Sequence, residues 1–258
     1  MAFSIENTAA HHLFTLLSAA RDSGAPSYAT AWSEALDTEW GTPEFAKRHS
    51  EVVSLLQLTI RQIEALPERP RLRAQRHTSA WWSAVMQPMA NWQDSGRPAA
   101  SLIDQDRLDH LESTADVISS NLEGTAAAPS SDKLEDLAKQ CQDWLALLSG
   151  SSEIAPALRD ELLSQVRHLI WLIEHADLFG GARVAQEASG VIGALTQAVS
   201  TLDVESPARG RWMNGLLAML AACVFFNQAA PIVQESISAG SDLVKEITSV
   251  VEQVQQDD

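Results

Sequence analysis

The sequence predicts an all-α protein, and three observations carry this prediction. Apolar residues recur at the three- and four-residue spacing of amphipathic helices along most of the 258 residues. No stretch shows the sustained polar and apolar alternation, rich in β-branched residues, that is typical of strands. Proline, glycine and serine gather between the periodic stretches, where helices begin and end. The predicted architecture is an N-terminal helical bundle, a second helical hairpin region and a long C-terminal helix that is a candidate membrane span.

The N-terminal bundle is predicted to cover residues 1–123. Gly24 ends its first helix, and Thr42 with Pro43 supplies an N-cap and first-turn start for the longest one. Pro67 and Pro70 predict a break in the helical pattern. The expected helices are about Ile5–Asp22, Tyr28–Trp40, Thr42–Ala65, Ser79–Pro88 and Asp104–Leu122.

Two further domains are predicted after a flexible linker at Gly124–Ser131. The hairpin domain, residues 132–203, has expected helices at about Asp132–Leu148, Ala155–Phe179 and Ala182–Leu202. Gly180 and Gly181 mark the turn between the last two, because glycine tolerates the left-handed backbone that helix ends use. Residues 206–258 form the long C-terminal helix.

The overall charge limits the partners of the chain. Eighteen Lys and Arg residues against 34 Asp and Glu residues leave a net charge of −16, which repels polyanions at long range. Binding to bulk duplex DNA is therefore not expected. Cys141 and Cys223 make neither a disulfide framework nor a thiolate zinc site, so a reducing compartment fits best. The N-terminus also lacks the pattern of a signal peptide.

A cluster of arginines locally reverses this acidic balance, and two tryptophans follow it. The guanidinium fork recognises phosphate and aromatic rings stack on bases, so a nucleotide or a short single-stranded nucleic acid is the expected ligand. The alternative is that the arginines pair with carboxylates on neighbouring helices and the tryptophans belong to the core. The candidate ligand-binding residues are Arg61, Arg69, Arg71, Arg73, Arg76, Trp81 and Trp82, with Arg97 and Arg107 as extensions of the patch.

Other chemistry finds little support in the sequence. His11 and His12 are adjacent and would point about 100° apart on a helix, whereas His168 and His175 lie two turns apart. Neither spacing suits one metal ion. There is no Gly-rich phosphate loop, nucleophile elbow or catalytic Cys and His spacing. We therefore predict no catalytic residue, no metal site and no cofactor, and we do not expect an enzyme.

The uncharged stretch Trp212–Gln234 is the least ordinary feature of the chain. As a helix it would span roughly 35 Å, enough to cross a hydrocarbon core of about 30 Å. Asn214 and Pro231 count against insertion in lipid. Arg209 and Arg211 precede the stretch and an acidic tail follows it, so the large N-terminal portion would stay in the cytosol. The alternative is a buried central helix of a soluble bundle.

A heptad seam runs through the same region and favours self-association into a homo-oligomer. It comprises Trp212, Leu216, Met219, Cys223, Phe226, Ala230, Val233, Ile237, Gly240, Val244, Ile247, Val251 and Val254, and residues 237–254 are its expected helical tail. Small and polar residues recur every seven positions on another face. If copies pack along the seam in a membrane, this stripe would line a pore; in water it would be the wet face of an amphipathic helix. The candidate pore-lining residues are Asn214, Ala221, Gln228 and Glu235.

An all-α portion up to about Leu202, followed by the single uncharged helix Trp212–Gln234, resembles the membrane effectors of bacterial antiviral (abortive-infection) defence systems. The resemblance covers this layout alone. It implies a cytosolic domain that senses a nucleotide signal, gating an oligomeric helix that forms a pore in, or perturbs, the bacterial inner membrane. The arginine cluster would then receive the signal. The alternative is a soluble, cytoplasmic all-α interaction, scaffold or inhibitor protein in which the same helix is buried core.

Overall fold

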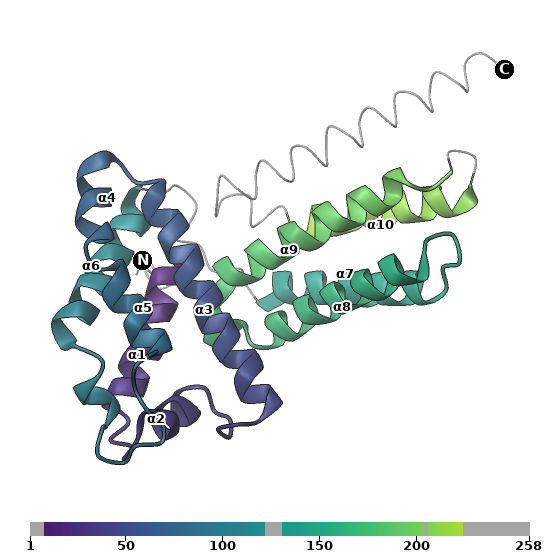
Figure 1. Cartoon of the computed structure of the whole chain (residues 1–258). Helices are drawn as coiled ribbons and strands as arrows, with labels where there is room; N and C mark the ends of the chain where they lie inside the picture. The colour runs from purple at the N-terminus through teal and green to yellow at the C-terminus, as the bar shows by residue number, and fades with distance from the viewer. Residues whose placement is uncertain (1–7, 122–130, 204–205, 224–258) are drawn as a thin grey trace. The chain divides into compact units, whose positions relative to one another are not determined.

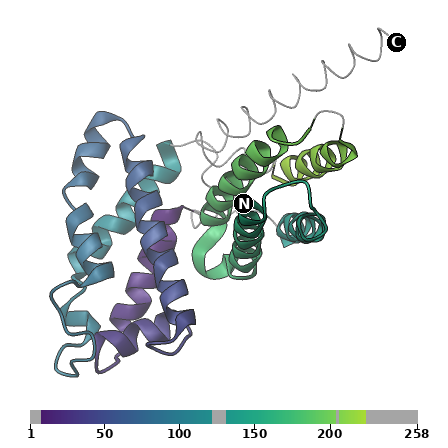
Figure 2. The same cartoon turned by 45° about the vertical axis from the view of Figure 1, so that its right-hand side comes forward.

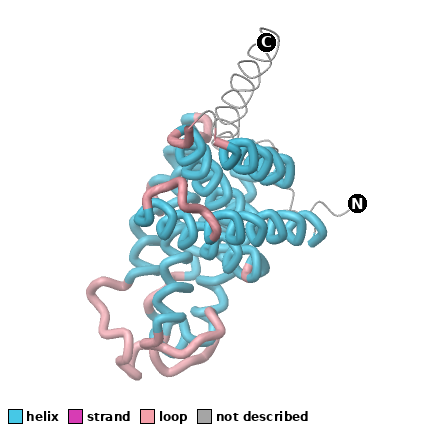
Figure 3. Tube along the Cα trace, turned by 90° about the vertical axis from the view of Figure 1, so that its right-hand side faces the viewer, coloured by secondary structure: helices cyan, strands magenta, loops and turns pink. Residues whose placement is uncertain are grey.

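The structure is a computed structural model that describes residues 8–121, 131–203 and 206–223. Every regular element in these ranges is a helix, which confirms the predicted all-α class (Figures 1 and 3). The described residues form two compact units. Unit 1 comprises those of Met1–Ala128 and His175–Arg183, and unit 2 those of Pro129–Glu174 and Val184–Asp258.

The first three helices of unit 1 begin where capping side chains place them. Thr8, Ser27 and Thr42 each accept a hydrogen bond at the side-chain oxygen from the backbone N–H three residues later. Such a bond satisfies one of the amides that a helix leaves without an internal partner. The helices that follow are α1 (Ala9–Asp22), α2 (Tyr28–Ala35) and α3 (Pro43–Glu64).

The predicted break at Pro67 is confirmed, since α3 ends at Glu64, but the prediction that helical structure resumes only near Ser79 was wrong, because the arginine-rich segment is itself a helix. Helix α4 (Glu68–Gln75) has Pro67 as its N-cap and Pro70 in its first turn. A proline there removes no helical hydrogen bond, because the first amides of a helix have no partner within it. Helix α5 (Thr78–Met86) follows almost at once and ends at Gln87, whose φ of 35° is left-handed.

Helix α1 is the central element of unit 1. It packs against α2, α3 and α6 (Gln105–Asn121), and also against the 3-10 helix η1 (Ala99–Ser101). Its apolar face is fully buried, as Leu13 and Leu17 illustrate. The burial of such leucine side chains contributes about 1.5 to 3 kcal/mol each. Packing of this face, rather than helix propensity, is therefore what holds the short helices of unit 1.

Residues 175–183 belong to unit 1 although they are distant in sequence from the rest of it. The Nε of Arg183 donates to a carboxylate oxygen of Glu51 on α3 at 2.7 Å, and both side chains are about 95% buried, with 6% and 5% exposed. Gly180 has φ 80° and ψ 159°, a backbone conformation essentially restricted to glycine. The turn predicted at Gly180 is confirmed, but the helix before it ends at Glu174 rather than at Phe179.

The described residues of unit 2 form four helices. Helix α7 packs against α8 and α10, and residues 184–200 of α9 run alongside α10 (Figures 1 and 2). Trp144 and Trp212 meet edge to face at 5.5 Å between ring centroids, and the Trp144 indole N–H donates to the carbonyl of Gly215 at 3.2 Å. The helices are α7 (Ser131–Ser149), α8 (Pro156–Glu174), α9 (Ala176–Ser200) and α10 (Pro207–Cys223).

The first part of the predicted membrane segment lies in α10 and packs into unit 2. Trp212, Leu216, Met219 and Cys223, the first four positions of the heptad seam, are all buried within the chain. No helix of the described residues is long and apolar enough to cross a membrane. The rest of the predicted span and the tail 237–254 lie outside the described residues.

Candidate functional site

A pocket of about 640 Å³ lies between α4 and α6 in unit 1. It combines cationic side chains, two imidazoles and an apolar floor. Its lining residues are Leu66, Arg69, Pro70, Arg73, Ala74, Arg76, His77, His110, Ser113, Thr114 and Val117.

The sequence of α4 places its cations on the pocket side. Arg69 and Arg73 are four residues apart and therefore share one face of the helix, with Pro70 and Ala74 beside them. Arg76 caps the C-terminal end of α4 and lines the same cavity. Three guanidinium groups thus surround one hollow with an apolar wall.

On the α6 side of the pocket, the lining residues recur at helical spacing on one face: His110, Ser113, Thr114 and Val117. Ser113 donates its hydroxyl hydrogen to the carbonyl of Asp109 at 2.9 Å, and Thr114 donates to that of His110 at 2.7 Å. Both hydroxyls therefore use their single hydrogen within the helix. The donors left for an anion are the guanidinium and imidazole groups.

His77 and His110 stack face to face, with ring centroids 3.9 Å apart and planes inclined by 19°. The Nη1 of Arg107 lies 2.9 Å from Nδ1 of His77. A guanidinium only donates, so this His77 nitrogen accepts and the imidazole is neutral. Burial, the charge of His110 and then Arg107 and Arg76 lower the pKa of His77 below its usual value.

No carboxylate of the described residues pairs with the pocket arginines. None of their carboxylate oxygens lies within 4.0 Å of Arg69, Arg73 or Arg76. Arg48 and Arg183, by contrast, each meet a glutamate within 3 Å. The pocket therefore keeps an unneutralised positive charge in a chain of net −16.

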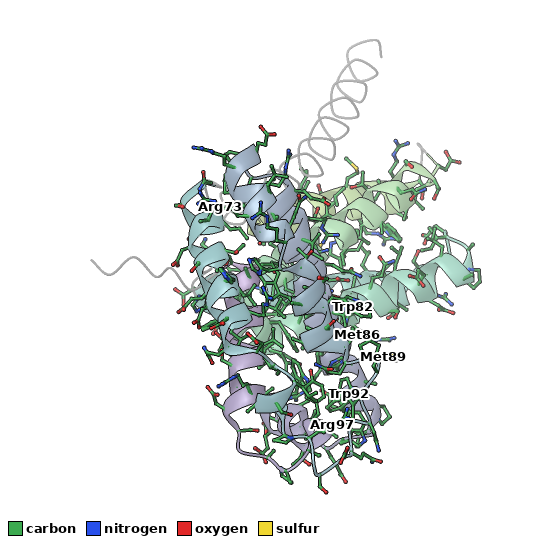
Figure 4. All side chains as sticks on the ribbon, turned by 60° about the vertical axis from the view of Figure 1, so that its left-hand side comes forward. Arg73, Trp82, Met86, Met89, Trp92 and Arg97 are labelled. Carbon is green, nitrogen blue, oxygen red and sulfur yellow. The ribbon has the colours of Figure 1, made fainter. Side chains whose placement is uncertain are left out.

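Three of the seven predicted ligand-binding residues line the pocket: Arg69, Arg73 and Arg76. Arg61 on α3 and Arg71 on α4 are half-buried and lie outside its lining. Arg107 contacts His77 beside the pocket, whereas Arg97 is 3.7 Å from Asp94 and lies well away from Arg73 (Figure 4).

The two tryptophans do not join this lining. Trp81 is fully buried, and its indole N–H donates to the carbonyl of Arg107 at 2.8 Å, so its ring belongs to the core. Trp82 is 44% exposed but lies apart from Arg73, nearer to Met86 and Met89 (Figure 4). Stacking of a base on these rings is therefore not combined with the arginine pocket.

Sequence reasoning missed His77 and His110, which are as central to the pocket as the arginines. Nothing local marks them, because they are 33 residues apart in sequence and meet only when α6 packs against the junction of α4 and α5. The available local signal was the four-residue spacing of His110 and Thr114, which places both side chains on one face of an amphipathic helix.

The remaining predicted sites lie elsewhere. Among the described residues, no group of three His, Cys, Asp or Glu side chains is arranged to hold a metal ion. Of the predicted pore-lining residues, Asn214 and Ala221 are exposed on α10 near Leu217, which is 43% exposed. Gln228 and Glu235 lie outside the described residues.

Comparison of the chain with protein-family models, with curated proteins and with solved structures finds no match. The chemistry of the pocket therefore rests on its own geometry. That geometry offers several guanidinium donors, a stacked pair of imidazoles and an apolar wall, which together suit an anionic ligand with an apolar part.

Proposed function

We propose that unit 1 binds a small phosphate-bearing ligand of mononucleotide size in the α4–α6 pocket. The observation that carries the proposal is the set of three arginines without a carboxylate partner around one cavity. Arginine donates two parallel hydrogen bonds to phosphate, and such charge-assisted bonds are roughly twice as strong as neutral ones. A bound anion would neutralise the pocket guanidinium groups, which no carboxylate of the described residues does.

The pocket also suits the rest of such a ligand. Its volume of about 640 Å³ is in the range of small-molecule sites. Leu66, Pro70, Ala74 and Val117 offer an apolar wall for a ring or a sugar. The net charge of −16 opposes long nucleic acids, and the separation of Trp82 from Arg73 favours a mononucleotide over a stacked single strand.

Binding without catalysis is the proposed role of this pocket. The hydroxyls of Ser113 and Thr114 are committed to helix carbonyls, so neither is held by a neighbouring base in the way an activated nucleophile is. The ligand would act as a signal that unit 1 recognises, which agrees with the sensing role implied by the resemblance stated above.

Isothermal titration calorimetry of the full chain at low ionic strength tests this proposal. The probes are inorganic phosphate, a panel of mononucleotides and a short single-stranded oligonucleotide. We expect Arg73→Gln to weaken binding of the best mononucleotide at least about tenfold, because one charge-assisted contact is lost. Arg71→Gln is the matched control, since Arg71 lies on the same helix outside the pocket lining.

Equal losses in Arg73→Gln and Arg71→Gln would show that only the general charge of α4 matters and would contradict the pocket. Absence of binding for every phosphate probe would overturn the proposal outright. Preference for the oligonucleotide over all mononucleotides would replace the proposed ligand class with single-stranded nucleic acid.

For the whole chain, the observations favour the all-α interaction protein over the membrane effector. Burial of Trp212, Leu216 and Met219 inside unit 2 supports a role of this helix as core. The oligomeric membrane effector stays a prediction, since most of its span lies outside the described residues. Recovery of the expressed full chain after a carbonate wash without detergent is expected; extraction only by detergent would favour the effector.

A further inference from the structure

We propose that the stacked His77–His110 pair makes the α4–α6 pocket a proton-coupled site, in which an anion binds together with a proton taken up by the imidazoles. The inference rests on the proposed function, because it concerns the same pocket. It adds a condition under which that pocket is occupied: anion affinity rises as the pH falls through the neutral range.

Without an anion, the geometry disfavours a pair in which both rings are charged and favours a neutral His77. Two imidazoles whose centroids are 3.9 Å apart repel each other if both are charged. Arg107 donates to Nδ1 of His77 at 2.9 Å, so the remaining proton of a neutral ring sits on Nε2. Burial and these neighbouring cations hold the pKa of His77 below its ordinary value.

The groups that face the pair are predominantly cationic. Arg73 and Arg76 approach from α4 and its C-terminal end, and Arg107 from α6. Trp81 contributes a neutral ring 6.1 Å from His77. The acids on the packed elements are Glu44, Glu51 and Glu64 on α3, Glu68 on α4, and Asp106, Asp109, Glu112 and Asp116 on α6; none lines the pocket, and in the described part of the chain none is within 4.0 Å of either imidazole.

An anion in the pocket reverses this balance. Two negative charges beside the imidazoles favour their charged form. Because binding and protonation are linked, the bound state holds more protons than the free state wherever His77 is otherwise neutral. Affinity must then increase as the pH falls, at most about tenfold per pH unit for one proton.

Sulfate is the probe that isolates this effect, because it carries two charges throughout the range in which histidine titrates. A phosphomonoester gains charge near pH 6 and would mix its own titration with that of the protein. We measure the sulfate dissociation constant of the full chain from NMR shifts at about pH 6 and about pH 8. The expected result is about tenfold tighter binding at the lower pH.

The variant His77→Asn, alone and with His110→Asn, tests the assignment. Asparagine can still accept from Arg107 but does not titrate, so we expect the sulfate affinity of the double variant to change less than about twofold with pH. Retention of the full pH dependence in the double variant would overturn the inference. If the variants do not fold, the pKa of His77 measured in the parent must rise with saturating sulfate; an unchanged value overturns the inference equally.

The outcomes separate the two proposals. Sulfate binding that is equal at both pH values removes the proton coupling and leaves the anion pocket standing. Failure of sulfate to bind at either pH overturns the inference, and failure of every nucleotide as well overturns the proposed function.

Discussion

Two sets of arginines within unit 1 are held in opposite ways. Arg183 is buried against the Glu51 carboxylate at 2.7 Å, with 6% and 5% of the two side chains exposed. Arg73 and Arg76 line an open cavity, and no described carboxylate lies within 4.0 Å of either. The chain has 34 acids for 18 cations, so a shortage of acids does not explain the second arrangement.

This difference distinguishes an arginine that stabilises the fold from arginines that are available to bind a ligand. A buried guanidinium must meet a carboxylate, because an isolated buried charge costs several kcal/mol. An exposed guanidinium has no such requirement, and its charge stays available to a molecule from solution. Changing members of each set should therefore affect different measured properties, stability for the first set and ligand affinity for the second.

The largest expected effect is that of Glu51→Gln. It leaves the Arg183 guanidinium buried without this carboxylate, and we expect the free energy of unfolding of unit 1 to fall by about 3 to 5 kcal/mol. Urea unfolding followed by circular dichroism measures it. Glu44→Gln is the matched control on the same helix: the Glu44 side chain is 42% exposed and lies 2.9 Å from Arg48, so we expect a loss below about 1 kcal/mol. Equal losses would remove the distinction between the two settings.

The second effect, from Gly180→Ala, concerns the backbone that presents Arg183. A Cβ at Gly180 would lie 2.3 Å from the His12 ring, and the φ of 80° with ψ of 159° is strained for any other residue. We expect a loss of about 3 kcal/mol from strain and overpacking together. Gly190→Ala, which meets no atom within 4 Å on α9, is the control and should not destabilise the chain. Similar unfolding midpoints for both variants would contradict this account.

Acidification gives a third and smaller effect. Burial lowers the pKa of His49, and burial with nearby cations lowers that of His77, so the unfolded chain binds more protons than the folded chain below about pH 6.5. Stability is then complete above that pH and declines as the pH falls, by at most about 1.4 kcal/mol per pH unit for each histidine. Thermal melts between about pH 8 and pH 5 check the sign. His77→Asn should reduce the loss of stability on acidification. A larger loss in this variant would contradict the contribution assigned to His77.

The smallest effect is a gain in stability. Arg69 and Arg73 are like charges four residues apart, a spacing that costs about 0.2 to 0.5 kcal/mol on a helix surface. Arg73→Gln should therefore raise the free energy of unfolding by a few tenths of a kcal/mol while it weakens anion binding. Chemical denaturation of Arg73→Gln beside Arg71→Gln provides the comparison. Destabilisation by Arg73→Gln would show that this arginine is structural, like Arg183.

Local signals in the sequence predicted part of the fold. Thr42 was predicted as a helix start, and Thr8 and Ser27 fix the starts of α1 and α2 in the same way, through contacts only three residues long. Pro70 misled, because proline ends a helix from within but is tolerated in its first turn. Whether a proline interrupts or begins a helix depends on where the capping groups fall, which the segment alone does not show.

The candidate site was predictable only in part, for a related reason. Clustering of arginines in an acidic chain made the segment conspicuous, but the predicted absence of a helix there hid that Arg69 and Arg73 share one face of α4. The contact of His77 with His110 and that of Glu51 with Arg183 join positions distant in the chain, so only the packing of helices reveals them. Trp81 and Trp82 are adjacent, yet a rotation of about 100° buries one ring and exposes the other.

The two cysteines of the chain, Cys141 and Cys223, are both buried in unit 2. Burial raises the pKa of each thiol to about 12, so almost no reactive thiolate exists while the bundle is closed. A thiol reagent can therefore modify the protein only when unit 2 opens. The rate of that modification would report how often the bundle of unit 2 opens. Unit 1 carries no cysteine, so the thiol reagent would not modify it in the same experiment.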